Sequence, residues 1–330
     1  MSSGACSFLI CYNFPTMKYI IILFIILLLP VQAFSAQVYI VKTTDRAEGI
    51  KLLLENHPLP DLEGKKIIIK PNFNSDDPFP ATTHIDTLRE VIKAVKAQDP
   101  KSITIAERSG MGDTDRVLSN RGVYKLSLEE QVKVVNLDAL DTDEWILMGL
   151  TDTYWKKGYL VPKIVTEADY IINIPCLKTH RFGGDFTMAL KNNVGLVAKS
   201  GPTHNYMWEL HTSPHQRLMI ADINKNIATD LVIMDAIKGF KNKGPEKGDL
   251  IEPELMLLSD DIIAIDAVGV AILRMYGTTD KVQEGDIFDL DQIRRAAEFH
   301  LGVRFAEEIE LVAANRAAEP VIEKISNILY

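Results

Sequence analysis

A basic cluster follows one of the strands that the sequence predicts. Lys178, His180 and Arg181 lie within four positions of one another, beside a Gly-Gly pair, and Lys191 follows a few residues later. Lysine and arginine side chains bind carboxylates and phosphates, and a histidine can transfer a proton or bind a metal. The cluster predicts an anion site in which Lys178 and His180 act on the substrate. A solvated basic loop is the alternative.

A second polar cluster follows the apolar run at residues 66–70. Ligands of open α/β sheets bind beyond the carboxyl ends of the strands, and the free N–H groups at the start of a helix favour anions. An ordinary turn with a threonine cap is the alternative. With the residues that follow the basic cluster, the predicted substrate contacts are Lys70, Asn72, Asn74, Thr82, Thr83, Lys191 and Asn192.

Two further groups are candidates for metal or substrate binding. His204, His211 and His215 are three of the seven histidines and fall within twelve positions. Imidazole is a ligand of zinc, copper, iron and nickel, so a divalent transition metal is one hypothesis, although the spacing matches no recognised ligand pattern. Asp235 ends another apolar strand, where it could orient a substrate or a metal as part of the catalytic group.

Several carboxylates and a cysteine elsewhere in the chain are expected to have structural rather than functional roles. Asp260 or Asp261 is expected to cap a helix that begins there. Asp266 lies on an apolar face of that helix, so it needs a cation or a hydrogen-bond donor as its partner. Cys176, beside Pro175, is expected to pack in the core rather than to act as a nucleophile.

These residues must be positioned by a folded α/β domain. Short apolar runs alternate with segments of helical period, which predicts a mostly parallel sheet with helices on both faces and two lobes around a cleft. Residues 107–165 are rich in turn glycines and give the weakest pattern. The predicted strands are 38–41, 66–70, 102–106, 132–137, 170–174, 231–234 and 255–258, and helices are predicted at 45–56, at 87–98 and from Ser213 onward.

The composition excludes several classes of protein. The chain has 330 residues, is 47% hydrophobic and 25% charged, and has a formal net charge of −9. These proportions are typical of a globular protein and not of a disordered one. The acidic balance is evidence against a general nucleic-acid binder. No Gly-x-Gly-x-x-Gly fingerprint, Walker loop or Gly-x-Ser-x-Gly elbow occurs, which argues against dinucleotide dehydrogenases, P-loop ATPases and α/β-hydrolases.

The first 36 residues have the pattern of a secretory signal. Lys18 precedes an apolar run at 19–29, and small residues follow, with cleavage expected after Ser35 or Ala36. Met17 is the expected true start. The predicted mature protein is exported, periplasmic or secreted, without a stable membrane span; an uncleaved N-terminal anchor is the alternative. Loss of Lys18 lowers the net charge by one, from −9 to −10.

Removal of the leader also leaves Cys176 as the one cysteine of residues 37–330. A single thiol cannot form an internal disulfide, so the fold must depend on its core. It cannot hold an iron–sulfur cluster by itself either, because such a cluster needs about four thiolates. Residues 37–330 are expected to form a single domain, with two subdomains at about 37–165 and 166–330 as an option.

Several blocks together resemble the domain-of-unknown-function 362 (DUF362) family. Many members of that family carry an added ferredoxin-like module with cysteine-bound iron–sulfur clusters, which this sequence lacks, and the family implies no settled activity. The matching blocks, in order, are Ile69-Lys70-Pro71-Asn72, Thr82-Thr83, Ile174-Pro175-Cys176-Leu177-Lys178-Thr179-His180, Ala189-Leu190-Lys191-Asn192, Val232-Ile233-Met234-Asp235-Ala236 and Asp260-Asp261-Ile262-Ile263-Ala264-Ile265-Asp266-Ala267.

Two functional hypotheses remain at the level of sequence. The first is an exported enzyme that binds a small anionic substrate at the strand ends, alone or with a metal, where Lys70, Lys178 and Lys191 neutralise the ligand and His180 moves a proton. The second is a non-catalytic accessory protein of the cell envelope that binds a metal or ligand or supports a redox partner. In the second hypothesis the three clustered histidines are the important group.

Overall fold

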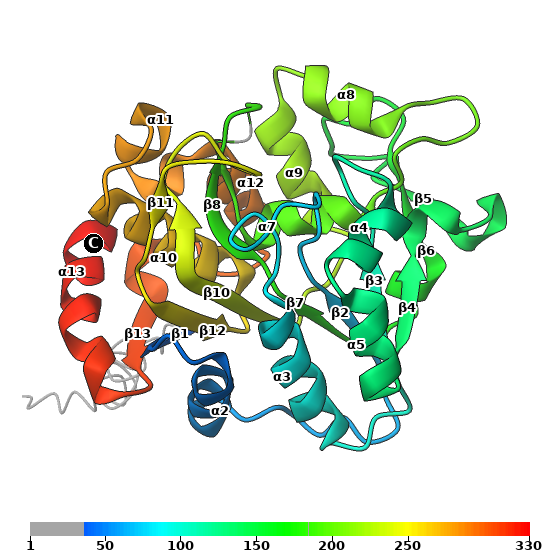
Figure 1. The fold of residues 1–330 in the computed structure, drawn as a ribbon. Coiled ribbons are helices and arrows are strands. Elements are labelled where there is room, and N and C mark those ends of the chain that lie inside the picture. Colours follow the sequence, from blue (N-terminus) through cyan, green and yellow to red (C-terminus); the bar gives the residue numbers. More distant parts are fainter. Residues whose placement is uncertain (1–35, 184) are drawn as a thin grey trace, which may run out of the picture. The chain divides into compact units, whose positions relative to one another are not determined.

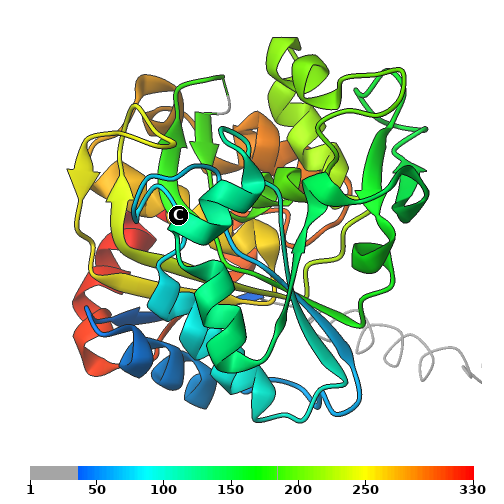
Figure 2. The same ribbon diagram turned by 45° about the vertical axis from the view of Figure 1, so that its right-hand side comes forward.

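The computed structural model describes residues 36–183 and 185–330, and these residues form one compact unit. The predicted leader, its start at Met17 and its cleavage site lie outside the described residues, apart from Ala36. Figures 1 and 2 show the fold in two views that differ by a turn of 45° about the vertical axis. Within the described residues no helix is long and apolar enough to span a bilayer.

One large sheet organises the protein. The strands from β10 to β4 run parallel to one another, and β12 lies antiparallel to both of its neighbours. The strand order is β13 (Ile309–Ala313), β1 (Ala36–Lys42), β12 (Leu255–Ser259), β10 (Leu231–Phe240), β7 (Tyr170–Asn173), β2 (Lys66–Lys70), β3 (Ser102–Glu107) and β4 (Lys133–Asn136). The predicted α/β class with a mostly parallel sheet is confirmed.

Shorter strands extend this sheet beside β10 and form a separate hairpin. β8 (Cys176–His180) pairs with the second half of β10 and with β9 (Asp185–Thr187), and β11 (Leu250–Ile251) pairs with β10 on its other side. β5 (Trp145–Met148) and β6 (Tyr159–Pro162) make a two-stranded antiparallel sheet. β8 carries two of the basic residues that the sequence singled out.

Helices cover both faces of the sheet because its strands alternate between two apolar cores. Ile67 and Ile69 of β2 face one core, whereas Ile68 faces the other. The helices, in chain order, are α2 (Arg46–Asn56), α3 (Ile85–Lys96), α4 (Thr114–Asn120), α5 (Val123–Glu130), α6 (Lys163–Thr166), α7 (Ala189–Asn192), α8 (Tyr206–Thr212), α9 (Gln216–Asn224), α10 (Ile262–Met275), α11 (Asp280–Gln283), α12 (Asp291–Glu298) and α13 (Glu319–Leu329).

The two helical layers differ in which part of the chain supplies them. Helices α2, α3, α4 and α5 pack on the face that Ile67 and Ile69 share, and α7, α9, α10 and α12 pack on the opposite face (Figures 1 and 2). The sheet itself interleaves strands from both halves of the chain, since β2 and β3 lie beside β7 and β10. Strands from before and after residue 165 therefore share one sheet, and the division into two subdomains stays a prediction.

The predicted strands are present, with small differences in length. The largest difference is in β10, which runs on to Phe240, because its second half pairs with β8 after a shift of register between Asp235 and Gly239. The helix predicted from Ser213 begins later, at Gln216, with His215 as its N-cap. The Ser213 hydroxyl instead accepts the His215 N–H at 3.0 Å and closes a short turn.

Candidate functional site

A cavity of about 390 Å³ lies where β2 and β3 end, and it collects most of the residues that the sequence singled out. Parallel strands bring their carboxyl ends to the same edge of the sheet, and loops and the short helix α7 close the remaining sides. Eight of the predicted site residues line this cavity: Lys70, Asn72, Asn74, Lys178, His180, Lys191, Asn192 and His211, the last of which the sequence singled out as a metal ligand.

Two charged residues that sequence reasoning missed complete the lining. Glu107 is the last residue of β3, and Arg108 follows it. Both side chains are buried. The signal that could have found them is the same one that identified Lys70: a charged residue directly at the end of an apolar strand.

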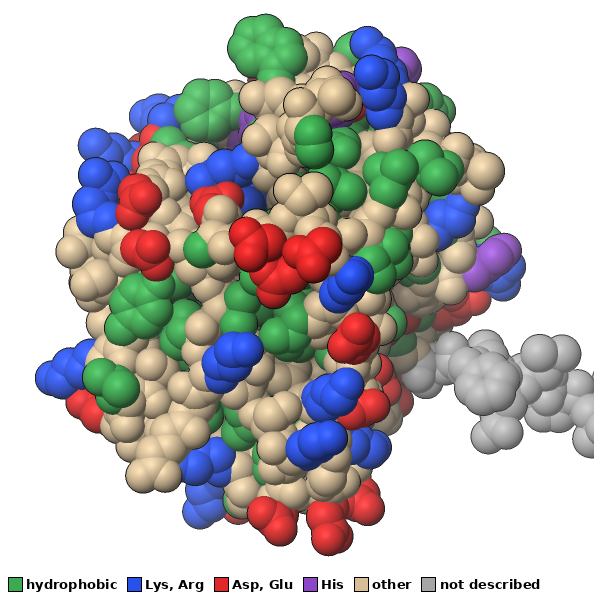
Figure 3. Space-filling view, turned by 90° about the vertical axis from the view of Figure 1, so that its right-hand side faces the viewer, with side chains coloured by type: hydrophobic (Ala, Val, Ile, Leu, Met, Phe, Trp, Pro, Cys, Tyr) green, Lys and Arg blue, Asp and Glu red, His purple; other side chains and the backbone are tan. Residues whose placement is uncertain are grey.

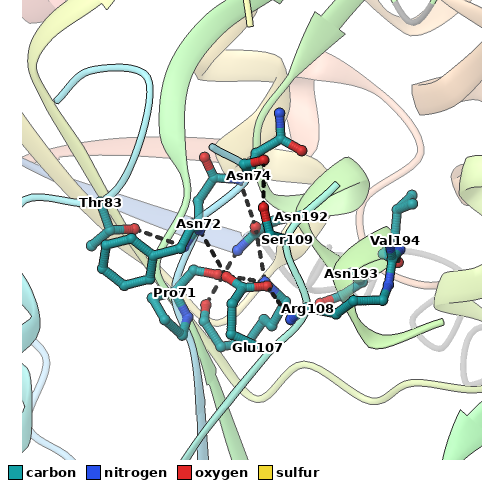
Figure 4. Close-up of polar contacts among 12 residues, drawn as sticks. Pro71, Asn72, Asn74, Thr83, Glu107, Arg108, Ser109, Asn192, Asn193 and Val194 are labelled. Carbon is teal, nitrogen blue, oxygen red and sulfur yellow. Dashed lines mark hydrogen bonds and ion pairs between the residues drawn. The ribbon is translucent and has the colours of Figure 1, made fainter. Parts of the chain in front are cut away.

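Lys70 and Glu107 form a buried ion pair at the floor of the cavity. Lys70 Nζ lies 2.8 Å from Glu107 Oε1 and also donates to the Pro71 carbonyl at 2.5 Å. The other Glu107 oxygen accepts the Phe73 N–H at 2.8 Å, and Oε1 also accepts the Arg108 N–H at 2.8 Å. Burial lowers the pKa of Lys70, and the Glu107 carboxylate opposes that shift. Glu107 therefore ties together the loops after β2 and β3, as Figure 4 shows.

Asn72 and Asn192 hold two of the lysines in place. Asn72 Oδ1 accepts a hydrogen bond from Lys178 Nζ at 2.7 Å, and Asn72 Nδ2 donates to Asn192 Oδ1 at 3.0 Å. Asn192 Oδ1 also accepts from Lys70 Nζ at 3.3 Å, and Asn192 Nδ2 donates to Asn173 Oδ1 at 2.7 Å. These amides connect the end of β2 with β7, β8 and α7 across the cavity floor. Figure 4 shows Asn72 and Asn192 of this network.

Positive charge in the cavity exceeds negative charge. Among the described residues that line it, Glu107 supplies the one carboxylate, and Lys70 is its ion-pair partner. Lys178, Lys191 and Arg108 are all buried, and no described carboxylate lies within ion-pair distance of them. On the face of the protein in Figure 3, by contrast, Lys and Arg side chains are mixed with Asp and Glu.

Several buried polar atoms of the cavity wall lack partners among the described residues. Arg108 donates through Nη2 to the Val194 carbonyl at 2.7 Å, but its Nε and Nη1 make no hydrogen bond. The same holds for Nδ1 of His180 and the hydroxyl of Thr187. Buried donors and acceptors are nearly always satisfied in folded proteins, so unpartnered groups around one cavity indicate a ligand or ordered water.

Burial lowers the pKa values of three further basic residues that line the cavity, so these residues release their protons more readily. Burial, reinforced by the charges of Lys178 and Arg108, lowers the pKa of Lys191 to about 7. Burial and the neighbouring Lys191 hold the pKa of His180 well below its ordinary value, so His180 is neutral at neutral pH. Burial also lowers the pKa of His211, which lines the same cavity. The cavity thus contains a lysine, Lys191, that can change its charge near pH 7.

Asp266 positions the helix that carries Lys191. Its carboxylate accepts the Ala189 N–H at 2.7 Å and the Leu190 N–H at 3.0 Å, which are the first two N–H groups of α7. The prediction that this carboxylate needs a hydrogen-bond donor is confirmed. Burial nevertheless raises the pKa of Asp266 to about 7. A four-residue helix has little stability of its own, so this cap holds Lys191 against the cavity.

Asp235 lies away from the cavity in an ion pair. Its Oδ2 is 2.7 Å from Nε of Arg46 and accepts the Thr87 hydroxyl at 2.6 Å. Arg46 of α2 thus neutralises the Asp235 carboxylate of β10, and Thr87 of α3 donates a hydrogen bond to it. Asp235 does not line the cavity, and its contacts lie where α2 and α3 pack on the sheet; its role in substrate orientation stays a prediction.

The two predicted threonines also lie outside the cavity. Thr83 donates to the Ile174 carbonyl at 3.0 Å and accepts the Asn72 N–H at 2.7 Å, so it fixes the loop that carries Asn72. Thr82 donates to the Asp77 carbonyl at 2.8 Å. These hydroxyls support the loop after β2 but are not placed to contact a ligand in this cavity.

The three clustered histidines lie in three different environments. His204 pairs through Nε2 with Glu209 Oε2 at 2.5 Å, His211 Nδ1 lies 2.7 Å from the Met207 carbonyl at the cavity, and His215 packs on the ring of Tyr154. The chain separates them because His211 lies in the last turn of α8 whereas His215 caps α9. Among the described residues no group of three His, Cys, Asp or Glu side chains is placed to hold a metal. The geometry does not unite these histidines as metal ligands.

Cys176 lies in the core, as the sequence predicts. It is buried at the start of β8, and burial raises the pKa of its thiol to about 11. A thiol with so high a pKa stays protonated and is a poor nucleophile at neutral pH.

Comparison with known proteins identifies a family. The sequence model of the family described as "Domain of unknown function (DUF362)" matches residues 67–271. A thylakoid-associated protein of Synechocystis sp. is 31% identical over 222 residues, which cover 66% of this chain and 65% of that protein. The match therefore spans less than two thirds of the length of that relative.

Among solved structures, the lactate racemase apoprotein from Thermoanaerobacterium thermosaccharolyticum is similar to part of this chain. The two share 17% identity with a TM-score of 0.42, and the superposition covers 61% of this chain and 50% of the racemase. A likeness of this degree carries no conclusion about activity.

Proposed function

We propose that this chain, which belongs to the DUF362 family through the match over residues 67–271, binds a small oxyanion in the cavity at the ends of β2 and β3. The ligand is a carboxylate or a phosphate. Lys178, Lys191 and Arg108 neutralise it, and His180 and Lys191 are the groups that exchange protons with it.

The observation that carries this proposal is the unmatched buried positive charge. Burying a charge without a partner costs several kcal/mol even after the protein relaxes. Lys178 and Arg108 are nevertheless at most 3% exposed and have no described carboxylate within ion-pair distance. An oxyanion in the cavity would supply the missing negative charge and accept hydrogen bonds from the free Nε and Nη1 of Arg108.

In this proposal, the uncharged forms of Lys191 and His180 accept a proton from the ligand. A general base works best when its pKa lies near the operating pH, and Lys191 has a pKa of about 7. His180 is neutral and its Nδ1 has no described partner, so a ligand can donate a hydrogen bond to that atom or accept one from it. No metal is assigned, since the described residues offer no suitable group of ligands.

Isothermal titration of the purified protein with phosphate, sulfate and acetate tests the binding. Arg108→Met is the informative variant, because two of the three guanidinium nitrogens make no hydrogen bond with the described residues. We expect it to weaken binding at least about tenfold, the equivalent of about 1.4 kcal/mol. Arg304→Met, at an exposed arginine paired with Glu308, is the matched control and should leave the affinity unchanged. Absence of binding for all three anions would refute the proposal.

Proton transfer is tested separately from binding. The tightest-binding carboxylate is incubated with the protein in heavy water, and its carbon-bound hydrogens are followed by NMR. Incorporation of deuterium that is lost in Lys191→Met supports an enzyme. Binding without incorporation supports the alternative of a binding protein that does not act on this ligand.

The location of the protein is a further part of the proposal. The apolar run at 19–29 and the small residues after it favour export. Cell fractionation, followed by determination of the N-terminus of the exported form by mass spectrometry, tests this. An N-terminus at Ala36 or Gln37 supports cleavage, and an intact N-terminus in the membrane fraction supports the anchor instead.

A further inference from the structure

The cavity that holds the unmatched charges also has an apolar side. Besides the cationic residues and amides described above, its lining includes Met111, Phe182 and Met207. Met111 and Phe182 are each 48% exposed, so they do not belong to the two packed cores. Large apolar side chains that remain exposed at the edge of a concave site are available to a ligand.

The apolar and charged parts of the wall are in direct contact. The sulfur of Met207 lies 3.3 Å from Nη2 of Arg108, the guanidinium with free hydrogen-bond donors. A ligand whose oxyanion meets Arg108 therefore has a thioether next to its neighbouring carbon atoms. Methionine side chains adapt their shape and make favourable contacts with aromatic rings.

Phe182 is oriented at the same site by two basic neighbours. The guanidinium of Arg181 lies 4.3 Å from the centre of the Phe182 ring, and the ring of His180 meets it edge-on with the centroids 5.7 Å apart. Such contacts favour one ring position and leave part of the ring exposed. The aromatic surface thus lies beside His180, one of the proposed proton-transfer groups.

The volume of the cavity exceeds what an inorganic anion needs. At about 30 Å³ for each water in the liquid, 390 Å³ corresponds to roughly 13 water molecules. Sites for organic ligands in proteins begin at about 300 Å³. An inorganic phosphate would leave most of this cavity filled with water that contacts methionine and phenylalanine side chains.

From these observations we propose that the ligand is an organic oxyanion with an aromatic or other compact apolar body, whose charged group meets Arg108, Lys178 and Lys191 and whose body lies against Met111, Phe182 and Met207. This inference rests on the proposed function and adds the class of ligand. The ligand must contact the charged part and the apolar part of the cavity wall at the same time.

Two pairs of probes test the inference by isothermal titration: phosphate with phenyl phosphate, and acetate with phenylacetate. Each pair keeps the anionic group and adds one ring. We expect the aryl member of at least one pair to bind at least about tenfold more tightly, because burying a ring gains more than about 1.4 kcal/mol. The pair that shows the larger gain identifies the anionic group.

Phe182→Ala is the variant that isolates the apolar side. The expected result is a fall of the aryl advantage by at least about threefold, measured as the ratio of the two affinities within a pair. Phe305→Ala is a matched control, since Phe305 is 55% exposed, lies under the guanidinium of Arg304 and does not line the cavity. The ratio should be the same in this control as in the unchanged protein.

The outcomes separate this inference from the proposed function. Equal affinity for both members of each pair would overturn the aromatic body and leave anion binding in place. An aryl advantage that survives Phe182→Ala would also overturn it, because the ring would then bind elsewhere. Failure of every probe to bind would overturn both proposals.

Discussion

Lys70 Nζ lies 2.8 Å from Glu107 Oε1, and both side chains are almost fully buried where β2 and β3 end beside each other. The pair has two consequences. It neutralises the charge of Lys70, and it uses the one carboxylate that the described lining of the cavity contains. The remaining cations, Lys178, Lys191 and Arg108, therefore have no carboxylate partner among the described residues, and we propose that a ligand supplies one.

Glu107→Gln is expected to destabilise the fold strongly. The variant leaves Lys70 buried without its counter-charge, and breaking a buried pair from one side costs about 3–5 kcal/mol. Urea denaturation measures the change. The control is Glu90→Gln, which breaks an exposed pair with Lys93 and should cost no more than about 1 kcal/mol. Equal losses in the two variants would show that the buried pair has no special weight.

Anion affinity is expected to fall as the pH rises above 7. Lys191 has a pKa of about 7, and its charged form is the one that attracts an anion. A bound anion raises that pKa, so binding takes up a proton and the decline approaches tenfold per pH unit above pH 7. Sulfate is the suitable probe because its charge is constant over pH 6–9. His180 and His211 are neutral over most of this range, since both pKa values are lowered.

Lys191→Met is expected to make sulfate binding weaker at pH 6 and almost independent of pH. Titration at pH 6, 7, 8 and 9 checks both points. If Lys191→Met kept the full pH dependence, the titrating group would instead be Lys70 or Lys178, whose pKa values are also lowered by burial.

Lys191→Met is also expected to stabilise the protein below pH 7. In the unfolded chain the lysine keeps its proton up to about pH 10, whereas the folded chain releases it near pH 7. The unfolded state thus binds more protons between these values, and the stability of the unchanged protein rises with pH across that window. The variant should lack this rise and gain on the order of a few kcal/mol at pH 6. Thermal and urea unfolding at pH 6 and pH 9 measure the difference, and an unchanged stability at pH 6 would contradict it.

Asp266→Asn is expected to weaken anion binding through α7. The substitution replaces one accepting oxygen by an NH₂ group, so one of the N–H groups of Ala189 and Leu190 loses its partner, which costs about 1–3 kcal/mol. Faster hydrogen exchange at these two amides, together with a several-fold loss of sulfate affinity, is the expected result.

A matched control for that variant is available at the start of α10, the helix that contains Asp266. Asp261 caps α10, and its carboxylate also accepts backbone N–H groups, those of Ile263, Ala264 and Val303. Asp261→Asn should lower stability without changing sulfate affinity, since Asp261 does not line the cavity. If both variants weakened sulfate binding equally, the effect of Asp266 would be one of global stability rather than of positioning.

Asp266 also makes a contribution of opposite sign to the pH dependence of stability. Its pKa of about 7 lies above that of an unfolded aspartate, so the folded state binds more protons between about pH 4 and pH 7. Stability from this group therefore falls as pH rises through that window. The difference in unfolding free energy between Asp266→Asn and the unchanged protein should vary with pH from 4 to 7 and level off above 7; a constant difference would place the pKa of Asp266 in its ordinary range.

The sequence by itself determined the class of fold and much of the candidate site. Strands and helices were predictable because hydrophobic period is a local property, and polar residues at strand ends were predictable as neighbours because parallel strands end at one edge of a sheet. Lys70, Asn72 and Lys178 meet for that reason, although 106 residues separate Asn72 from Lys178.

Only the tertiary structure decided which polar residues face the cavity and which satisfy one another. Asp235 follows an apolar run as Lys70 does, but it lies inside β10, which continues to Phe240. Arg46 and Thr87 approach it from helices that the spacing of residues in β10 could not reveal. The histidines are near in sequence, yet a break between α8 and α9 directs His211 and His215 to different neighbours. Pairing of buried charges depends on side chains brought together from distant parts of the chain, and no local pattern encodes it.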